Sequence, residues 1–437
     1  MVPFAGTGAG VGELTWAQQG LWRAMVTTAS SLPLGGVSPL PPGFTVAAAG
    51  RVLAFATARH PSLRTRLLPG PEPMPRQEIA AAGEAVLTVL EAGTEDPGVV
   101  ADRLRARWED TPFDYTVEWP VRMGVVTVGG EPRRLVAVYC HLALDMHGLD
   151  VLIADLATMD PDTGRSPAPV AGTTALELAR RQRQPAGVRQ SAASLRHWDH
   201  MLRLIPARRL PGSARRRVPR WQELGLTSVA ALHAVRILAA RSGLRTRPLL
   251  LAACAVGLCR VAGTDPAVLQ VLVSNRFRPG LADLVTPLAQ SSLLVVPLSG
   301  APLVEVAARA QQETVRAAKN AYYDPLQLDQ VYERVDRDRA EDVDVDVFYN
   351  DRRRVAAHDD GGPVPTEADL RKSLGSAAPR LDRELERFDH RMFVHVNDVP
   401  DAVDWTVCAD SHHLGREDAR ALLLAMEGAL VEAALHG

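Results

Sequence analysis

A covered strand that passes through a polar turn into a helix, within residues 134–159, is the feature that most constrains this fold. Leu135–Tyr139 is an apolar and β-branched run, which is typical of a strand covered on both faces. The next apolar residues recur at helical spacing, and they are Leu149, Leu152, Ile153 and Leu156. The turn between the two elements carries His141, Asp145, His147 and Gly148. Titratable side chains at the end of a covered strand are a common arrangement for chemistry.

The length of 437 residues exceeds the size at which a single core keeps growing, so we expect two domains. The formal net charge is -2, with 49 basic and 51 acidic side chains. Such a chain has no strongly basic field to gather phosphates or anionic lipid. We therefore expect neither nucleic acid nor a membrane as a partner.

The cysteines lack the spacing of zinc ligands and are expected to be buried free thiols; they are Cys140, Cys254, Cys259 and Cys408. No metal site is expected. The N-terminus shows no basic segment followed by an apolar core, and no run reaches the roughly 18 apolar residues of a membrane span. These features indicate a soluble, cytoplasmic protein.

The first half of the chain is predicted to contain a mixture of helices and strands. Residues 1–12 are expected to be a flexible leader, because their GxGxxG-like spacing has no preceding strand. Thr15 is expected to cap a helix that runs to Met25, and a second helix is expected over Val46–Arg59. Val121–Val128 and Leu135–Leu144 then predict a hairpin. Residues 13–165 are assigned to an N-terminal lobe.

The second half of the chain is also predicted to contain both helices and strands. Residues 166–190 shift to Pro, Gly, Thr and Arg and are predicted to be an interlobe linker, followed by a C-terminal lobe over residues 191–437. Pro248–Gly263 predicts a helix that is apolar all round and therefore buried. Asp342–Tyr349 alternates strictly, which favours a strand with a solvated carboxylate face over a metal site. The coarse class is α+β.

His141 and Asp145 form an HxxxD pattern that allows two interpretations. An unperturbed imidazole has a pKa of about 6.5 and can exchange protons near neutrality, so His141 suits general base catalysis. A lone HxxxD pattern is also compatible with a structural polar cluster. A further HH pair, His412–His413, precedes the last helix and is set aside.

Six segments occur in the order and rough spacing found in condensation domains of nonribosomal peptide synthetases, which this chain resembles from about residue 12 onward. They are LTWAQQGLWRAM (14–25), RHPSLRTRLL (59–68), TPFDYTVEWPVRM (111–123), YCHLALDMHG (139–148), LVSNRFRPGLADLVTPLAQSSLLVVPL (272–298) and YYDPLQLDQV (322–331). No single segment identifies the family, and the resemblance depends on all six segments occurring in this order and spacing.

The resemblance implies two chloramphenicol acetyltransferase-like lobes in a V-shaped pseudodimer with a central tunnel. Donor and possibly acceptor carrier proteins would deliver substrates on phosphopantetheine arms, with no permanently bound cofactor. The family joins a donor thioester to an amine or a hydroxyl, giving an amide or an ester. His141 matches the second His of the family's HHxxxDG signature and is the predicted catalytic residue, as a base or positioning group.

The resemblance also assigns supporting parts. Asp145 matches the signature's structural Asp, which pairs with an arginine from the other lobe, and Arg276 is the candidate partner. A floor loop is expected at about 280–292 and a latch between the lobes at about 351–387. The signature departs from the family at Cys140, Met146 and His147, and Gln290 stands where the family usually shows Asn. The candidates for lining the tunnel are Cys140, Met146, His147, Gly148, Gln290 and Ser291.

The leading functional prediction is a free-standing condensation enzyme acting on a carrier-bound acyl or aminoacyl group and an amine or alcohol acceptor, which could be a small molecule. Two alternatives remain open. One is a catalytically silent condensation-like module that docks a partner enzyme to a carrier-bound peptide. The other is a coenzyme A-dependent acyltransferase of the same fold, which would need no carrier protein.

Overall fold

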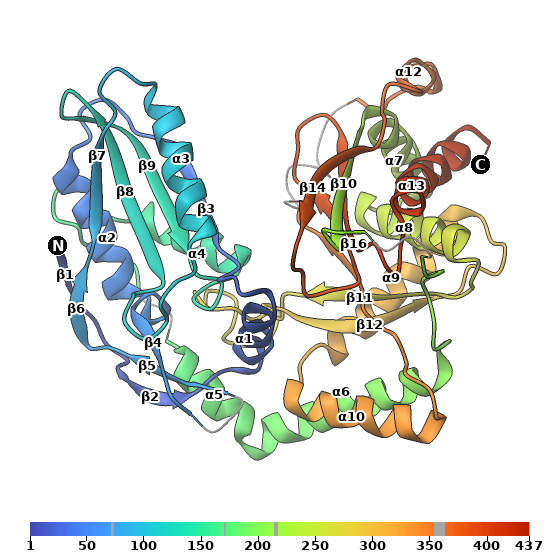
Figure 1. Ribbon diagram of the computed structural model, residues 1–437, viewed down its shortest axis with the longest axis horizontal. Coiled ribbons are helices and arrows are strands. Elements are labelled where there is room, and N and C mark those ends of the chain that lie inside the picture. The colour runs from blue at the N-terminus through green and yellow to red at the C-terminus, as the bar shows by residue number, and fades with distance from the viewer. Residues whose placement is uncertain (71–73, 170–171, 214–216, 354–362, 437) are drawn as a thin grey trace. The chain divides into compact units, whose positions relative to one another are not determined.

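The computed structural model describes residues 1–70, 74–169, 172–213, 217–353 and 363–436 (Figure 1). The chain divides into two compact units. The first unit comprises Met1–Ser191 and Ser274–Gln290, and the second comprises Ala192–Val273 and Ser291–Gly437. The predicted linker 166–190 falls inside the first unit, where it forms α5 (Ala175–Arg183) and the start of α6 (Pro185–Leu204).

The main sheet of the first unit has the strand order β3 (Leu34–Pro39), β9 (Glu131–Tyr139), β8 (Val121–Val128) and β7 (Leu87–Glu91). β8 and β9 form the predicted antiparallel hairpin, and β7 runs parallel to β8. Gly129 and Gly130 turn the hairpin with φ angles of 59° and 82°, which glycine adopts without strain.

Both faces of this sheet are covered. On one face, Leu53 of α2 (Val46–Arg59) and Leu152 of α4 (Met146–Leu156) share a core with Met123 and Tyr139. On the other face, Leu104 of α3 (Pro97–Asp110) packs with Val126 and Val136. The double coverage explains why the Leu135–Tyr139 segment is apolar at nearly every position.

The prediction of a flexible leader over residues 1–12 is wrong. β1 (Val2–Ala5) pairs with β6 (Ala82–Ala85), and β2 (Gly10–Glu13) pairs with β5 (Arg76–Ile79), next to β4 (Thr65–Leu68). Phe4 is buried and stacks edge-on against Trp119 at 5.3 Å between ring centroids. A Cβ on Gly12 would lie 2.8 Å from a methyl of Leu176 in α5. The glycines therefore permit close helix packing on a paired segment.

α1 (Trp16–Thr28) begins at the predicted cap. The Thr15 hydroxyl accepts from Gln18 N–H at 3.2 Å, and the Gln18 side chain accepts from Thr15 N–H at 2.9 Å, which completes a capping box. The amide of Gln182 in α5 accepts from Trp16 N–H at 3.0 Å. All three bonds are buried, so the start of α1 is fixed against the rest of the unit.

The second unit is built on a seven-stranded sheet. Its strand order is β12 (Gln290–Val296), β11 (Ala267–Val273), β13 (Val347–Asp351), β15 (Met392–Asn397), β16 (Val403–Asp410), β10 (Trp221–Ser228) and β14 (Arg380–Leu385). β11, β13 and β15 are parallel, whereas β16, β10 and β14 continue the sheet in antiparallel pairs.

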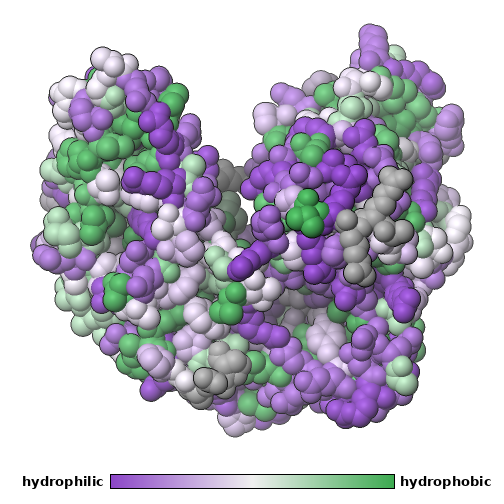
Figure 2. Space-filling model, in the orientation of Figure 1, coloured by the Kyte–Doolittle hydropathy of each residue, from purple (hydrophilic) through white to green (hydrophobic). Residues whose placement is uncertain are grey.

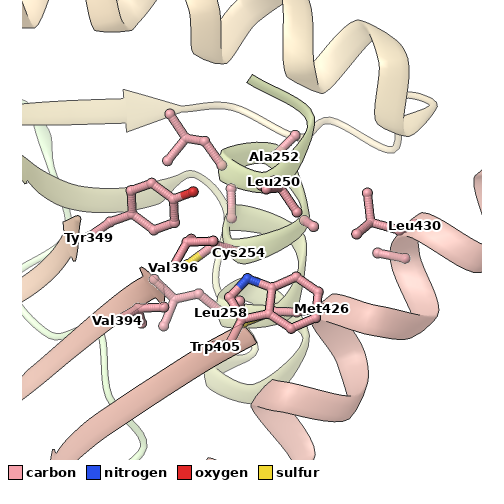
Figure 3. Packing of buried hydrophobic residues seen from close by; sticks show 14 of the residues in the cluster. Leu250, Ala252, Cys254, Leu258, Tyr349, Val394, Val396, Trp405, Met426 and Leu430 are labelled. Carbon is pink, nitrogen blue, oxygen red and sulfur yellow. The ribbon is translucent and has the colours of Figure 1, made fainter. Parts of the chain in front are cut away.

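Four helices cover one face of this sheet, and they are α7 (Val229–Ser242), α8 (Thr246–Ala262), α9 (Leu303–Asn320) and α13 (Arg416–His436). Figure 3 shows Leu250, Cys254 and Leu258 of α8 in the same cluster as Trp405 of the sheet and Met426 of α13. The predicted all-round burial of this helix is confirmed. On the opposite face, α6 and α10 (Pro325–Arg339) pack on β11 and β12.

Two further predictions for this unit need correction. The strand expected over Asp342–Tyr349 begins only at Val347, because Asp344 N–H donates to Ala207 O and Asp346 N–H donates to the Asp344 side chain instead of joining the ladder. The two carboxylates pair with Arg391 and His390. The described parts of the predicted latch, residues 351–353 and 363–387, lie in the second unit. They contain α12 (Glu367–Ser373) and β14, which pairs with β10; residues 354–362 lie outside the described residues.

Exposed apolar residues gather at one edge of the first unit. The edge strand β7 and the residue before it leave Val86, Val89 and Leu90 exposed, and Figure 2 shows apolar surface over this part of the unit. The second unit is mostly hydrophilic in the same view. Within the described parts of the chain, no helix combines the length and apolarity needed to cross a membrane.

We predict that Thr15→Ala lowers the free energy of unfolding by about 1 kcal/mol, because a buried Ncap hydroxyl is lost at the start of α1. Urea denaturation followed by circular dichroism measures the change. Thr27→Ala, at an exposed position in the last turn of the same helix, is the matched control and should change stability by less than about 0.5 kcal/mol. Equal effects of the two substitutions would contradict a role for the cap.

Candidate active site

His141 lies two residues beyond β9 and is half-buried. Its backbone N–H donates to Ser31 O at 3.2 Å, and its ring Nδ1 lies 2.9 Å from Leu144 O. A carbonyl oxygen can only accept, so Nδ1 carries the proton of the neutral ring and Nε2 carries the lone pair. The turn thus fixes the tautomer in which Nε2 is the basic nitrogen.

Asp145 caps α4 and is buried. Oδ1 accepts from Gly148 N–H at 2.7 Å and from Arg276 Nη2 at 2.6 Å, while Oδ2 accepts from Leu288 N–H at 3.1 Å. The predicted contact between Asp145 and Arg276 is therefore present. Because both carboxylate oxygens are engaged by structural donors, Asp145 is suited to hold the turn rather than to transfer protons.

Arg276 organises the segment that follows β11. Nη1 donates to the carbonyls of Ala282 and Leu284 at 3.2 and 2.7 Å, and Nη2 donates to Thr286 O at 3.2 Å. Val285 is buried in the core that α2 and α4 share. These contacts explain why 274–290 belongs to the first unit, although the resemblance placed Arg276 and the floor loop in the C-terminal lobe.

The remaining signature residues lie in the first turn of α4 and differ in their burial. Gly148 is buried, and a Cβ there would lie 3.3 Å from Asp145 Oδ1 and 3.4 Å from Arg276 Nη2. Glycine at this position therefore leaves room for the cap and the ion pair. Met146 and His147 are exposed, with Met146 retaining 48% of its accessible surface. Their predicted place along a tunnel stays a prediction.

The other predicted lining residues have different surroundings. Cys140 is fully buried, and burial raises the pKa of its thiol to about 12, so the thiol stays protonated near neutrality and offers neither a base nor a nucleophile. Gln290 is buried at the start of β12. The Ser291 hydroxyl donates to Gln270 Oε1 at 2.7 Å and lies 3.3 Å from the Tyr323 hydroxyl, within the second unit.

Two supporting residues were missed by the sequence analysis. Ser31 holds the backbone of His141, and Gln18 donates from Nε2 to Leu142 O at 3.3 Å, which ties α1 to the turn. Gln18 falls within the helix predicted from Thr15 to Met25, but no residue pattern signals its contact with Leu142 O. Among the residues that the structure describes, no group of three His, Cys, Asp or Glu side chains could hold a metal ion.

We predict that Asp145→Asn destabilises the protein by about 3 to 5 kcal/mol, because Arg276 would remain buried without its counter-charge. Guanidinium denaturation followed by fluorescence measures the loss. Asp102→Asn is the matched control, since Asp102 is exposed and lies 3.7 Å from Arg105, and it should change stability by less than about 0.5 kcal/mol. A loss below about 1 kcal/mol in Asp145→Asn would contradict the proposed clamp.

We also predict that native thiols are inert. Burial raises the pKa values of Cys140, Cys254, Cys259 and Cys408 to about 12. At pH 8 the folded protein should therefore react very slowly with a thiol-specific disulfide reagent, and all four cysteines should react after unfolding. Rapid native labelling of Cys140, located by peptide mass mapping, is the contrary outcome.

Comparison with known proteins identifies the family. The family described as Condensation domain matches residues 9–360. The isonitrile lipopeptide synthase of Mycobacterium tuberculosis is 29% identical over 294 residues, which are 62% of this chain and 11% of the synthase. The curated relatives are far longer, and this chain spans 2% to 29% of their lengths.

Solved structures share the fold. The structure that explains condensation domain-mediated chain release from the enacyloxin polyketide synthase has a TM-score of 0.71 at 19% identity, covering 99% of this chain and 84% of that one. The X-domain of teicoplanin biosynthesis, solved in complex with OxyB, has a TM-score of 0.70 at 22% identity, covering 99% and 95%. These matches confirm the predicted α+β class. Together with the family match, they show that this chain belongs to the condensation domain family.

Proposed function

We propose that this chain forms an amide or ester bond between a carrier-bound acyl or aminoacyl thioester and an amine or alcohol acceptor, with His141 as its catalytic residue. The single observation that carries the proposal is the Nδ1 contact with Leu144 O, which leaves Nε2 as the basic nitrogen. Family membership supports the reaction class. The carrier proteins and their phosphopantetheine arms enter as substrate carriers.

The reaction would proceed by addition and elimination. The acceptor nitrogen or oxygen attacks the thioester carbonyl carbon, and His141 Nε2 takes the proton that the nucleophile loses. The tetrahedral intermediate then expels the phosphopantetheine sulfur, and the imidazolium returns the proton to the leaving thiolate. Proton transfer of this kind contributes roughly 10² to 10⁴-fold in rate, and holding the nucleophile in line can contribute more.

Asp145 and Arg276 support His141 through the backbone. Leu144, whose carbonyl orients the imidazole, directly precedes Asp145 in the chain. The Asp145 carboxylate is fixed by two N–H groups and one guanidinium, so the peptide that carries the Leu144 carbonyl is also held. The ion pair therefore positions the base without touching the reacting atoms.

Met146 bears on the choice of donor. The family signature has glycine at this position, whereas this chain presents an exposed thioether chain at the first turn of α4. The added bulk would restrict the donor side if the donor passes this turn. We propose that the accepted donors are small or differently shaped at the carbon next to the thioester.

A catalytically silent recruitment module is the second candidate. Cys140 replaces the first signature histidine, and the X-domain structure is of a complex with OxyB. The ordered contacts of His141, Asp145 and Arg276 favour the enzyme, because a docking module has no need for a fixed imidazole tautomer.

The test uses a donor loaded on a phosphopantetheinyl carrier, offered amine and alcohol acceptors, with products followed by intact mass. We predict that His141→Ala lowers turnover by at least about 10²-fold while the melting temperature is retained. His412→Ala is the matched control, because it removes an imidazole from an HH pair in the second unit. Undiminished turnover in His141→Ala would contradict the assignment of His141 as the base.

The same assay separates the alternatives. Equal turnover of free coenzyme A thioesters and carrier-bound donors supports a coenzyme A-dependent acyltransferase. If no donor is turned over and a second biosynthetic enzyme binds tightly, the recruitment module is supported. The prediction that the chain works as a free-standing enzyme is addressed by running the assay with separately purified carriers.

A further inference from the structure

Ser31 joins three parts of the first unit at one residue. It is 2% exposed and lies between α1 and β3. Its carbonyl accepts from His141 N–H at 3.2 Å, and its hydroxyl oxygen accepts from Phe113 N–H at 2.7 Å. The same hydroxyl lies 2.9 Å from the Tyr115 hydroxyl. The position of His141 is thus coupled to Tyr115 through one buried serine.

The backbone around Ser31 adopts an unusual conformation. Ala29 and Leu32 have φ angles of 51° and 46°, in the left-handed region that non-glycine residues rarely enter. Leu32 N–H donates to the Ser30 hydroxyl at 3.1 Å. Such conformations persist where the surroundings determine them, and they cluster at functional sites. The contacts of Ser31 are the local surroundings that hold this connection.

Tyr115 is itself fixed in place. Its ring packs edge-on against Trp22 at 5.5 Å between centroids, and its carbonyl accepts from Leu67 N–H at 2.8 Å. Burial raises the pKa of its hydroxyl above the ordinary value of 10.0, and the neighbouring Cys140 acts in the same direction. The phenol therefore stays protonated and can donate to the Ser31 hydroxyl across the neutral pH range.

Tyr115 and Cys140 line one small cavity. Its volume is about 20 Å³, which is room for about one water molecule, and Phe113 and Leu142 contribute to the same wall. The family signature has histidine at position 140. An imidazole there is larger than the cysteine side chain and would need more room in this cavity, whose wall Tyr115 shares. The size of the side chain that fits at position 140 therefore depends on Tyr115.

We propose that Tyr115 and Ser31 are positioning residues for His141, and that they hold the turn beside the space left by Cys140. This inference rests on the proposed function, because it assigns the support of the same base. The contact between the Tyr115 and Ser31 hydroxyls fixes the Ser31 side chain, which also accepts from Phe113 N–H. With Ser31 held in this way, its carbonyl accepts from His141 N–H. The imidazole consequently keeps its Nδ1 contact with Leu144 O.

Tyr115→Phe removes one hydroxyl and leaves the ring that packs on Trp22. We expect kcat to fall by about threefold to tenfold with KM changed less than twofold, since the base is displaced while substrate binding is untouched. Ser31→Ala removes the hydroxyl that serves both partners and should lower kcat at least as much. Tyr139→Phe is the matched control, because Tyr139 lies in the core shared with Leu53 and Leu152.

A second readout is independent of turnover. Long-range ¹H–¹⁵N spectra of imidazole-labelled protein report which ring nitrogen carries the proton. The His141 ring should be the Nδ1–H tautomer in the wild type and in Tyr139→Phe, and a tautomer mixture in Tyr115→Phe. If the wild type turns over no donor, the proposed function fails, and the spectra still decide whether Tyr115 positions His141.

A reciprocal variant tests the shared space. Cys140→His should lower kcat in the wild-type background, where the larger imidazole crowds the small cavity that Tyr115 lines. In the Tyr115→Phe background the same change should recover at least about threefold of the lost kcat. The proposal is overturned if Tyr115→Phe leaves both kcat and the His141 tautomer unchanged, or if Tyr139→Phe reproduces its effect.

Discussion

The buried ion pair between Asp145 and Arg276 is the interaction on which the candidate site depends. Both side chains are less than one-tenth exposed, and their closest atoms are 2.6 Å apart. Charges at that depth are costly unless their polar atoms find partners, and here the helix cap and three loop carbonyls provide most of them. One pair therefore fixes both the start of α4 and the course of residues 274–290.

The imidazole of His141 receives its orientation from main-chain atoms. Leu144 O fixes the ring, Ser31 O fixes the backbone, and Gln18 holds the intervening Leu142 O. Gln18 and Ser31, which lie far earlier in the sequence, thus contact the turn that also contains His141 and Leu144. Rigid support of this kind is what a base needs if its rate contribution comes from alignment.

The fold and the site differ in how far the sequence could predict them. The hairpin, the buried helix α8, the cap at Thr15 and the contact of Asp145 with Arg276 were predictable, because each rests on a local pattern or on motifs in register. The strands within residues 1–12 were not, because their partners lie about 70 residues away and their glycines resemble a loop. The Leu144 and Ser31 contacts are made by backbone carbonyls, which every residue possesses and no residue type reveals.

The return of residues 274–290 to the first unit has a consequence for how the chain folds. Asp145 and Arg276 are separated by 131 positions, and strands β10 and β11 of the second unit's sheet lie within that interval. Contacts of such long range slow folding, because the entropy of closing the loop is lost before the contact compensates for it. During synthesis on the ribosome, a nascent chain that ends at Ser191 already contains His141 but lacks its clamp. The turn that carries His141 is consequently among the last parts of the first unit to mature, and a fragment cut at that boundary would leave Asp145 without Arg276.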